Sequence, residues 1–210
     1  MAKTLIRSAR IIDKNSPFHQ QQLDILIDKG RIVKIGKKIK ADKSTKIIAY
    51  KNLFISLGWM DLRVDFAEPG HEYKEGIQSG LQAAAYGGFT TVVVMPSTFP
   101  AIDNRSSVEF LVNRANGHVV KLLPTGTVSK DGAGVELSEM YDMKQGGAIA
   151  FSDDKLSIKN NSLLFKALTY SQAFDGLVMD FPMDLDWVRE GQMNEGKTST
   201  EMGMRSEEHT

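Results

Sequence analysis

The sequence predicts an α/β protein that contains part of a (β/α)8 barrel and a small β module. Two observations support this prediction. From residue 57 onward, unbroken apolar stretches alternate with helix-like stretches of about 10 to 16 residues. Strands that helices cover on both faces have this unbroken apolar pattern, so the alternation indicates βα units and a parallel sheet. Residues 1–56, by contrast, are rich in strand-like sequence.

The β module is predicted from strand-like stretches at residues 4–12, 22–36 and 45–56, which alternate or cluster Ile, Leu, Val and Phe between polar breaks. Asp28-Lys29-Gly30 interrupts the middle stretch and is typical of a hairpin turn. We expect this module to pack and to carry no chemistry.

The larger part is predicted to hold about five strands and four helices. The expected strands are 58–66, 89–100 with its following loop, 119–128, 148–154 and 177–182, and the expected helices are 73–88, 106–117, 136–147 and 161–176. We expect Ser106 to start the second helix, and Gly87 and Gly88 to end the first helix rather than to form a phosphate loop. Because a closed barrel takes about 250 residues, we expect its first half or a little more, in a chain that is a fragment.

Composition narrows the function classes. The 26 basic and 26 acidic side chains cancel, so nothing favours nucleic acid or an anionic membrane as partner. No apolar run approaches the ~20 residues that span a bilayer, and residues 1–17 lack the apolar core of a signal peptide. The absence of cysteine excludes disulfides and thiolate metal sites and fits a cytoplasmic protein. Residues 205–210 resemble translated sequencing adapter, and we expect a non-native tail there; a native polar tail is the alternative.

One strand carries an unusual set of charges. Asp61, Arg63 and Asp65 fall at alternate positions of the expected strand 58–66, and alternate positions share one face of a strand. Three charges on one face of an otherwise apolar strand fit a solvated edge. They fit the remains of a site equally well.

The order and spacing of several motifs resemble those of the dihydroorotases, cyclic amidohydrolases of the amidohydrolase superfamily. The similarity runs through nearly all of residues 3–204 and is carried by LFISLGWMD, EPGHEYKEGIQSGLQAAAYGGFTTVVVMPSTFPAIDN, GVELSEMYDMKQGGAIAFSDD and REGQMNEGKTSTEMGM. The resemblance implies that residues 1–56 form the N-terminal part of a β sandwich. It also implies that residues 57–204 form the first half or more of an amidohydrolase-type (β/α)8 TIM barrel.

The resemblance further implies a zinc site, most of which this sequence lacks. Active family members carry Asp-x-His-x-His at the end of the first barrel strand, and its two imidazoles bind zinc. Here Asp61 is followed by Arg63 and Asp65, so both histidines are replaced. Arg63 has no lone pair to give a metal and stays protonated. We therefore predict no bound zinc and no catalytic residue.

Other site positions differ from the family as well. The arginine that pairs with the substrate carboxylate is Ala67, the asparagine of the family's Met-Pro-Asn is Ser97, and a histidine ligand of the fifth strand is Phe181. Asp154 retains the position of the metal-bridging carboxylate in one branch of the family. We expect a vestigial pocket made of Asp61, Arg63, Asp65, Ala67, Ser97, Asp154 and Phe181.

The histidines offer no replacement ligands. His19 lies in the β module, His71 in the Pro-Gly loop, His118 before the third barrel strand and His209 in the expected tail. None has a partner at the spacing of metal ligands, so we expect surface or packing positions.

A protein charge is expected to replace the lost metal. Loss of a dication leaves Asp61 and Asp154, with Asp65 added, and unpaired buried carboxylates are costly. Arg63 faces the same cavity, so our hypothesis is that it pairs with Asp154 or Asp61. Phe181 would fill the volume of the missing imidazole. Drift in a dispensable site is the alternative.

Three functions remain open at this point. The first is a catalytically inactive dihydroorotase-like protein of pyrimidine biosynthesis that acts as a structural or regulatory partner; the resemblance implies aspartate transcarbamoylase as a candidate partner and a homodimer when full length. The second is an active zinc-dependent dihydroorotase, which hydrolyses dihydroorotate to carbamoyl aspartate. The third is a module that reuses the pocket for another small molecule. The replaced ligands and substrate contacts favour the first.

Overall fold

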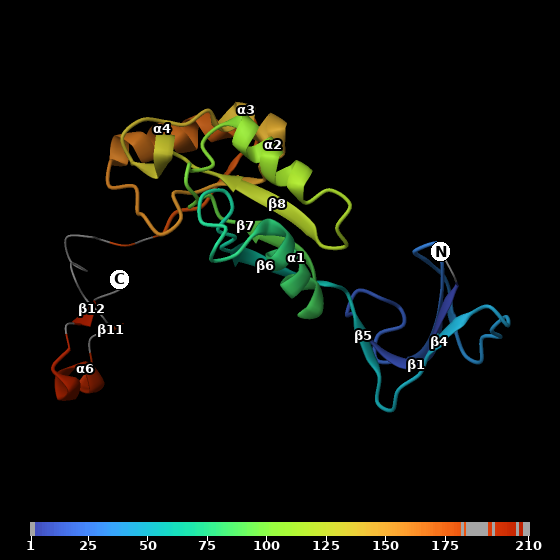
Figure 1. Cartoon of the computed structure of the whole chain (residues 1–210). Coiled ribbons are helices and arrows are strands. Elements are labelled where there is room, and N and C mark those ends of the chain that lie inside the picture. The colour runs from blue at the N-terminus through green and yellow to red at the C-terminus, as the bar shows by residue number, and fades with distance from the viewer. Residues whose placement is uncertain (1–2, 182, 184–192, 195, 205, 208–210) are drawn as a thin grey trace. The chain divides into compact units, whose positions relative to one another are not determined.

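The computed structural model describes residues 3–181, 183, 193–194, 196–204 and 206–207. The chain divides into two compact units, Met1–Gly58 and Trp59–Thr210 (Figure 1). Among the described residues, no helix is both long enough and apolar enough to cross a bilayer.

The first unit is a five-stranded mixed sheet. Its strands are β1 (Thr4–Ile12), β2 (Gln22–Asp28), β3 (Arg31–Gly36), β4 (Lys46–Ile48) and β5 (Phe54–Ser56). β1, β2 and β3 pair antiparallel in that order, whereas β4 and β5 each pair with β1 in parallel. Lys29 and Gly30 have φ of 49° and 76°, as the two-residue turn between β2 and β3 requires, so the predicted hairpin is confirmed. Its expected place in a sandwich stays a prediction.

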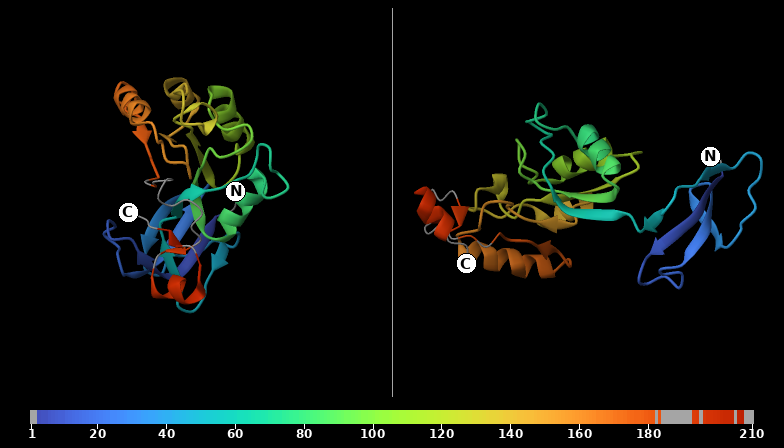
Figure 2. Two further views of the ribbon diagram at one scale, coloured as in Figure 1. Left: turned by 90° about the vertical axis from the view of Figure 1, so that its left-hand side faces the viewer. Right: turned by 90° about the horizontal axis from the view of Figure 1, so that it is seen from below.

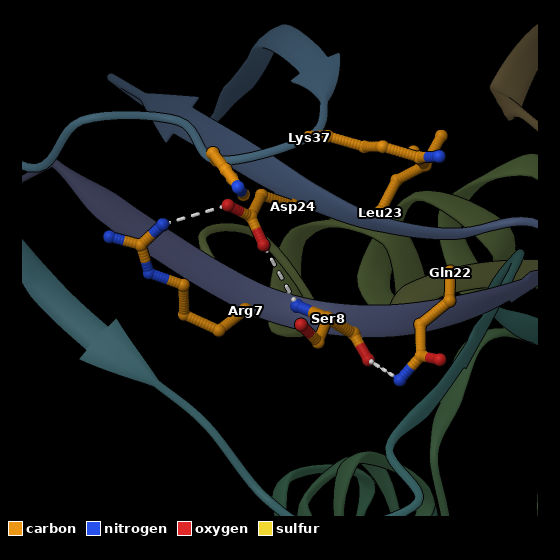
Figure 3. Close-up of a pocket in the computed structure, with 7 residues that line it drawn as sticks. Arg7, Ser8, Gln22, Leu23, Asp24 and Lys37 are labelled. Carbon is orange, nitrogen blue, oxygen red and sulfur yellow. Dashed lines mark hydrogen bonds and ion pairs between the residues drawn. The ribbon is translucent and has the colours of Figure 1, made fainter.

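Asp24 is a buried carboxylate that joins three segments of this sheet (Figure 3). Its Oδ1 accepts a hydrogen bond from the Ser8 amide at 3.0 Å, and its Oδ2 accepts from the Ile39 amide at 3.0 Å and from Arg7 Nη1 at 2.7 Å. Burial by itself would raise the pKa of Asp24, but the hydrogen bonds from Ser8, Ile39 and Arg7 outweigh it and lower this pKa below its ordinary value.

The second unit is a five-stranded parallel sheet whose spatial order, β6-β7-β8-β9-β10, is also the order along the chain (Figure 2). The strands are β6 (Trp59–Val64), β7 (Phe89–Val94), β8 (Lys121–Gly126), β9 (Ala150–Phe151) and β10 (Leu177–Val178). The helices between them are α1 (Ile77–Tyr86), α2 (Arg105–Arg114), the short η1 (Lys130–Gly132), α3 (Met140–Gly146) and α4 (Asn161–Gln172). This is the predicted series of βα units.

A short further segment follows this sheet in the chain. Its elements are β11 (Met193–Asn194), α6 (Lys197–Met202) and β12 (Ser206–Glu207), and β11 pairs with β12 in parallel. Residues 189–192 and 195 of the motif at residues 189–204 lie outside the described residues, as does all of the expected tail at 205–210 except Ser206–Glu207.

The core of the second unit lies between the sheet and its helices. α1 packs on β7, α2 on β8 and α4 on β10, so each of these helices contacts the strand that follows it. Val92, Val94, Leu81, Leu111 and Phe151 belong to one apolar cluster, and each is at most 1% exposed. Close packing of these side chains fixes the carboxyl ends of the strands, where barrels of this type place their sites.

Several element boundaries differ from the prediction. α2 begins at Arg105, and the side chain of Asn104 accepts a hydrogen bond from the Ser107 amide at 3.0 Å. The predicted start at Ser106 is therefore wrong, because Asn104 already supplies the capping oxygen. α3 begins only at Met140, and β6 and β9 are shorter than the expected strands 58–66 and 148–154.

Glycines shape both the interior and the end of α1. Gly87 caps this helix and Gly88 follows with φ of 84°, which confirms the predicted helix stop. Inside the helix, Gly80 permits close contact with the buried ring of Phe66. A Cβ atom at Gly80 would lie 2.3 Å from that ring.

The Gly80→Ala substitution should lower the free energy of unfolding by about 1–3 kcal/mol, because the methyl group would overpack the core against Phe66. The cost of overpacking should outweigh the ~1 kcal/mol by which alanine normally stabilises a helix interior relative to glycine. Denaturant titration measures the change. Gln82→Ala, on the exposed side of α1, is the control and should stay within about 0.5 kcal/mol of wild type. Stabilisation by Gly80→Ala would contradict the close contact.

The stability of the first unit should depend on pH through Asp24. Because its folded-state pKa is lowered, the contribution of this carboxylate is present above the unfolded-state pKa of about 3.9 and is lost as the pH falls through the folded-state pKa. Asp24→Asn should destabilise the unit by about 1.5–3 kcal/mol at neutral pH. Urea titrations at several pH values should show the deficit shrinking below about pH 3.9. A deficit independent of pH would contradict this role.

Candidate functional site

Polar side chains from distant parts of the chain meet at the carboxyl end of the parallel sheet. Arg63 lies near the end of β6, Ser97 follows β7 and Asp154 follows β9. Because these strands run in the same direction, their carboxyl ends share one edge, and the three side chains come together there. The sequence predicts all three as site residues.

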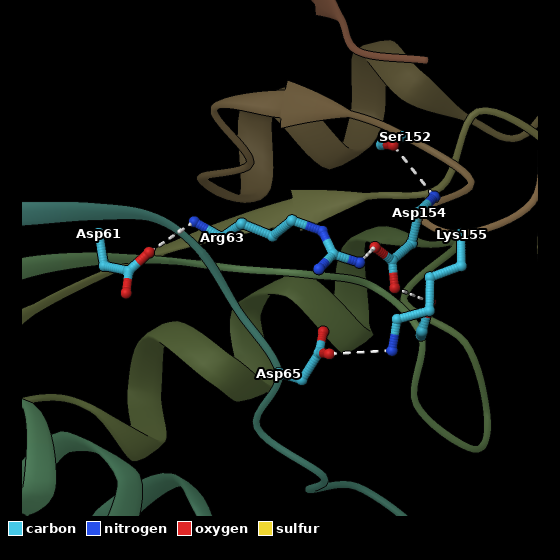
Figure 4. Close-up of polar contacts among 7 residues, drawn as sticks. Asp61, Arg63, Asp65, Ser152, Asp154 and Lys155 are labelled. Carbon is cyan, nitrogen blue, oxygen red and sulfur yellow. Dashed lines mark hydrogen bonds and ion pairs between the residues drawn. The ribbon is translucent and has the colours of Figure 1, made fainter. Parts of the chain in front are cut away.

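Asp154 is at the centre of this cluster (Figure 4). Its side chain is only 1% exposed. Oδ1 accepts a hydrogen bond from Arg63 Nη2 at 2.6 Å, and Oδ2 accepts from Ser97 Oγ at 2.7 Å. The Asp154 amide donates to Ser152 Oγ at 3.0 Å, and its φ of 55° is a left-handed conformation in which aspartate is enriched. Both carboxylate oxygens are therefore bound by protein groups.

The neighbouring carboxylate, Asp153, points to a different set of groups. Its Oδ1 accepts hydrogen bonds from the Val128 and Ser129 amides at 2.8 and 3.0 Å, and its Oδ2 accepts from Ser129 Oγ at 2.5 Å. These contacts tie the segment after β9 to the segment after β8. Asp153 thus holds the loop in the position that directs Asp154 into the cluster.

Arg63 forms the predicted pair with Asp154. Its side chain is half exposed, so the ion pair joins a buried carboxylate to a guanidinium that still reaches solvent. The hydrogen bond with Asp154 raises the pKa of Arg63 further above its ordinary value, with smaller contributions from the charges of Asp154 and Asp65. The guanidinium therefore stays charged at any physiological pH.

The other two charges of this strand have separate partners. Asp61 Oδ1 accepts a hydrogen bond from the Arg63 amide at 3.0 Å, and the guanidinium of Arg63 extends away from it toward Asp154 (Figure 4). The alternative pairing of Arg63 with Asp61 is therefore wrong. β6 ends at Val64, so Asp65 lies beyond the strand, and its Oδ2 accepts from Lys155 Nζ at 3.0 Å. Lys155 is not among the predicted site residues, and its only signal in the sequence is its position beside Asp154.

A cavity of about 210 Å³ lies beside the ion pair, lined by Leu62, Arg63, Met95, Ser152, Asp154, Met179, Asp180 and Phe181. Phe181 also lines this cavity and is 42% exposed. Its expected role in filling the volume of the missing imidazole stays a prediction. Ala67 is not among the lining residues. Its amide donates instead to the carbonyl of Glu75 in the following loop.

These residues do not fit a zinc ion. Zinc takes imidazole, thiolate or carboxylate ligands, and the part of the chain that the structure describes contains no group of three His, Cys, Asp or Glu placed to hold a metal. Asp154 is the retained carboxylate, but Arg63 lies 2.6 Å from it. A dication bound to Asp154 would be repelled by that guanidinium.

The histidines that the structure describes lie in local contacts. His19 Nδ1 accepts a hydrogen bond from the Asp13 amide, and His118 Nδ1 accepts from the Val120 amide. The ring of His71 packs edge-on against Tyr73. His209 lies outside the described residues.

Comparison with known protein families shows the family to which this chain belongs. The model of the family described as dihydro-orotase-like matches residues 53–206. The chain belongs to the dihydroorotase-like family. Curated relatives include dihydroorotases of Geobacter metallireducens, 38% identical over 202 residues, and of Syntrophus aciditrophicus, 38% identical over 204 residues. Each match covers 96% of this chain but 47% and 48% of the relative, so the chain spans about half the length of the curated relatives it matches.

Solved structures support the same fold. An L-hydantoinase (dihydropyrimidinase) from Arthrobacter aurescens superposes with a TM-score of 0.69 over 85% of this chain and 40% of its own, at 19% identity. A D-hydantoinase (dihydropyrimidinase) from a Thermus species gives 0.67 over 95% of this chain and 43% of its own, at 21% identity. The predicted fold is confirmed as part of an amidohydrolase TIM barrel with a separate small sheet.

Arg63→Met should lower the free energy of unfolding by about 2 kcal/mol, because it leaves the buried Asp154 without its counter-charge; the half-exposed guanidinium keeps the loss below that of a fully buried pair. Adding Asp154→Asn should recover much of this loss, with a coupling energy of about 1–2 kcal/mol in a double-mutant cycle. Lys121→Met, at an exposed position of β8, is the matched charge-removing control. Additive effects of the two site substitutions would contradict the pairing.

Proposed function

We propose that this chain is a dihydroorotase-like protein of pyrimidine biosynthesis that does not hydrolyse dihydroorotate and acts in the cytoplasm as a structural or regulatory partner of another enzyme. The observation that supports this proposal is the cluster of Arg63, Ser97 and Asp154. In that cluster a guanidinium and a hydroxyl bind the carboxylate that resembles the metal-bridging ligand of active relatives.

The chemistry of ring opening argues against hydrolysis at this site. Hydrolysis of a cyclic amide needs an activated hydroxide and a Lewis acid at the carbonyl, both of which a metal ion supplies. Arg63 supplies positive charge, but a guanidinium has no vacant coordination position for water and no proton to lose at neutral pH. The cluster can therefore stabilise Asp154 without generating a nucleophile.

The proposed partner is aspartate transcarbamoylase, and the proposed assembly of the full-length protein includes a homodimer. Both proposals rest on the resemblance to dihydroorotases. Curated relatives of this chain are named dihydroorotase. A well-packed core is retained, and the described residues include no group of three metal-ligating side chains. Both features are what a protein that works through its surface would need.

The chain, assayed with dihydroorotate in zinc-supplemented buffer, should show hydrolysis no faster than the buffer alone, since no residue of the cluster activates water. The double variant Arg63→His and Asp65→His should bind zinc at least about tenfold more tightly than wild type, because imidazoles replace a repelling cation. Arg63→Gln with Asp65→Asn removes the same charges without adding ligands and serves as the control. Hydrolysis by the wild-type chain would contradict the proposal. So would zinc binding by the control variant as tight as that of the double-histidine variant.

Partnership is tested separately from inactivity. Tagged chain should retain purified aspartate transcarbamoylase from the same organism, and adding the chain should change the stability or the rate of that enzyme. If hydrolysis is absent and no transcarbamoylase is retained, the partner assignment is wrong while the account of the site stands.

A further inference from the structure

We propose that the first unit contains an anion-binding site that accepts a phosphorylated small molecule. The site is a cavity of about 400 Å³ whose cationic lining residues are Arg7, Lys37 and Lys38. Figure 3 shows Arg7 beside Asp24, with Lys37 extending from the other side of that carboxylate. This site is distinct from the barrel cluster, and the proposal does not depend on the proposed function.

The guanidinium of Arg7 is held in a fixed position. Its Nη1 donates to Asp24 Oδ2 and to the carbonyl of Ile39, both at 2.7 Å. These bonds use two of the five N–H donors of a guanidinium, which leaves Nη2 and Nε for a ligand. The side chain is 32% exposed, so these remaining donors are accessible. A guanidinium held in this way loses little freedom when it binds a planar or tetrahedral anion.

The carboxylate of Asp24 is already bound by protein groups and is not available to a cationic ligand. Its two oxygens already accept three hydrogen bonds, from the Ser8 amide, the Ile39 amide and Arg7. These same bonds keep the carboxylate ionised, so its charge serves to hold Arg7. Asp24 has used three of its roughly four acceptor positions, whereas the unused capacity of Arg7, Lys37 and Lys38 consists of donors.

The charge of the lining residues selects the class of ligand. Arg7, Lys37 and Lys38 carry three positive charges against the single negative charge of Asp24, an excess of two. Within the described part of the chain, neither lysine has an ion-pair partner. A phosphate monoester carries about 1.5 to 2 negative charges at neutral pH and three acceptor oxygens, so it matches this excess better than a single carboxylate does.

The backbone of the lining is held in uncommon conformations. Ser8 and Lys38 have φ of 49° and 52°, in the left-handed region that residues other than glycine rarely adopt. Ser8 lies where the pairing of β1 with β2 shifts register between Ile6 and Ala9. This irregularity turns the Ser8 amide to Asp24 and so fixes the base of the cavity. Backbone strain of this kind is concentrated at binding sites.

The test is a titration of the chain with inorganic phosphate at low salt, followed by 31P NMR and by the shifts of the Ser8 and Ile39 amides. Lys37→Ala with Lys38→Ala should weaken phosphate binding at least about tenfold, and Arg7→Lys should weaken it severalfold because the planar fork is lost. Lys40→Ala with Lys43→Ala removes the same charge from exposed positions of the following segment and should leave binding within about twofold of wild type.

The outcomes separate specific binding from general attraction. Weaker binding by the Lys37→Ala, Lys38→Ala variant and by Arg7→Lys but not by the Lys40 and Lys43 control, together with amide shifts at Ser8 and Ile39, would support the site. Equal weakening by the Lys40 and Lys43 control would show only diffuse attraction to a basic surface and would overturn the proposal. Absence of phosphate binding to the wild-type chain would overturn it as well. Circular dichroism of each variant confirms that the sheet remains folded.

Discussion

The ion pair between Arg63 and Asp154 is the interaction on which the barrel site depends. It joins β6 to the segment after β9, residues separated by 91 positions in the chain. A carboxylate with a side chain only 1% exposed would be costly if unpaired. Arg63 meets this requirement with a charge that cannot be removed by any physiological change of pH. The hydroxyl of Ser97 binds the second oxygen and completes the coordination of the carboxylate by protein groups.

Under the proposed function, these protein groups supply the charge that a metal ion would otherwise supply to the carboxylates. In a metal-containing site, the ion neutralises the carboxylates that surround it. Here each carboxylate at the site has its own partner. Asp154 binds Arg63, Asp65 binds Lys155, and Asp61 accepts a hydrogen bond from the backbone amide of Arg63. The electrostatic role of the metal can thus be replaced by side chains, but its chemical role cannot, since activation of water requires a vacant coordination position.

The sequence predicted the larger features because they rest on long-range patterns. Apolar strands alternating with helices specify the parallel sheet, and the motif positions specify that Arg63, Ser97 and Asp154 meet. The errors concern local competition. Asp61 was an equal candidate to pair with Arg63, but its carboxylate accepts the amide two residues further along the chain. Ser106 was expected to cap α2, but Asn104 reaches the amide of Ser107 first.

Other features had no sequence signal strong enough to predict them. The first 56 residues were expected to carry no chemistry, and nothing in their pattern indicates that Asp24 would be buried against Arg7. That contact depends on a register shift in β1 and on a left-handed Ser8, which local sequence does not specify. The pairing of Lys155 with Asp65 likewise depends on how the loops after two distant strands meet.

The most direct test of this account is the zinc content of the purified chain, measured by elemental analysis after expression in zinc-supplemented medium. Because Arg63 occupies the carboxylate that a metal would need, the account predicts zinc far below one ion per chain. One or more tightly bound zinc ions per chain would contradict it, since that result would require a ligand set that displaces Arg63 from Asp154.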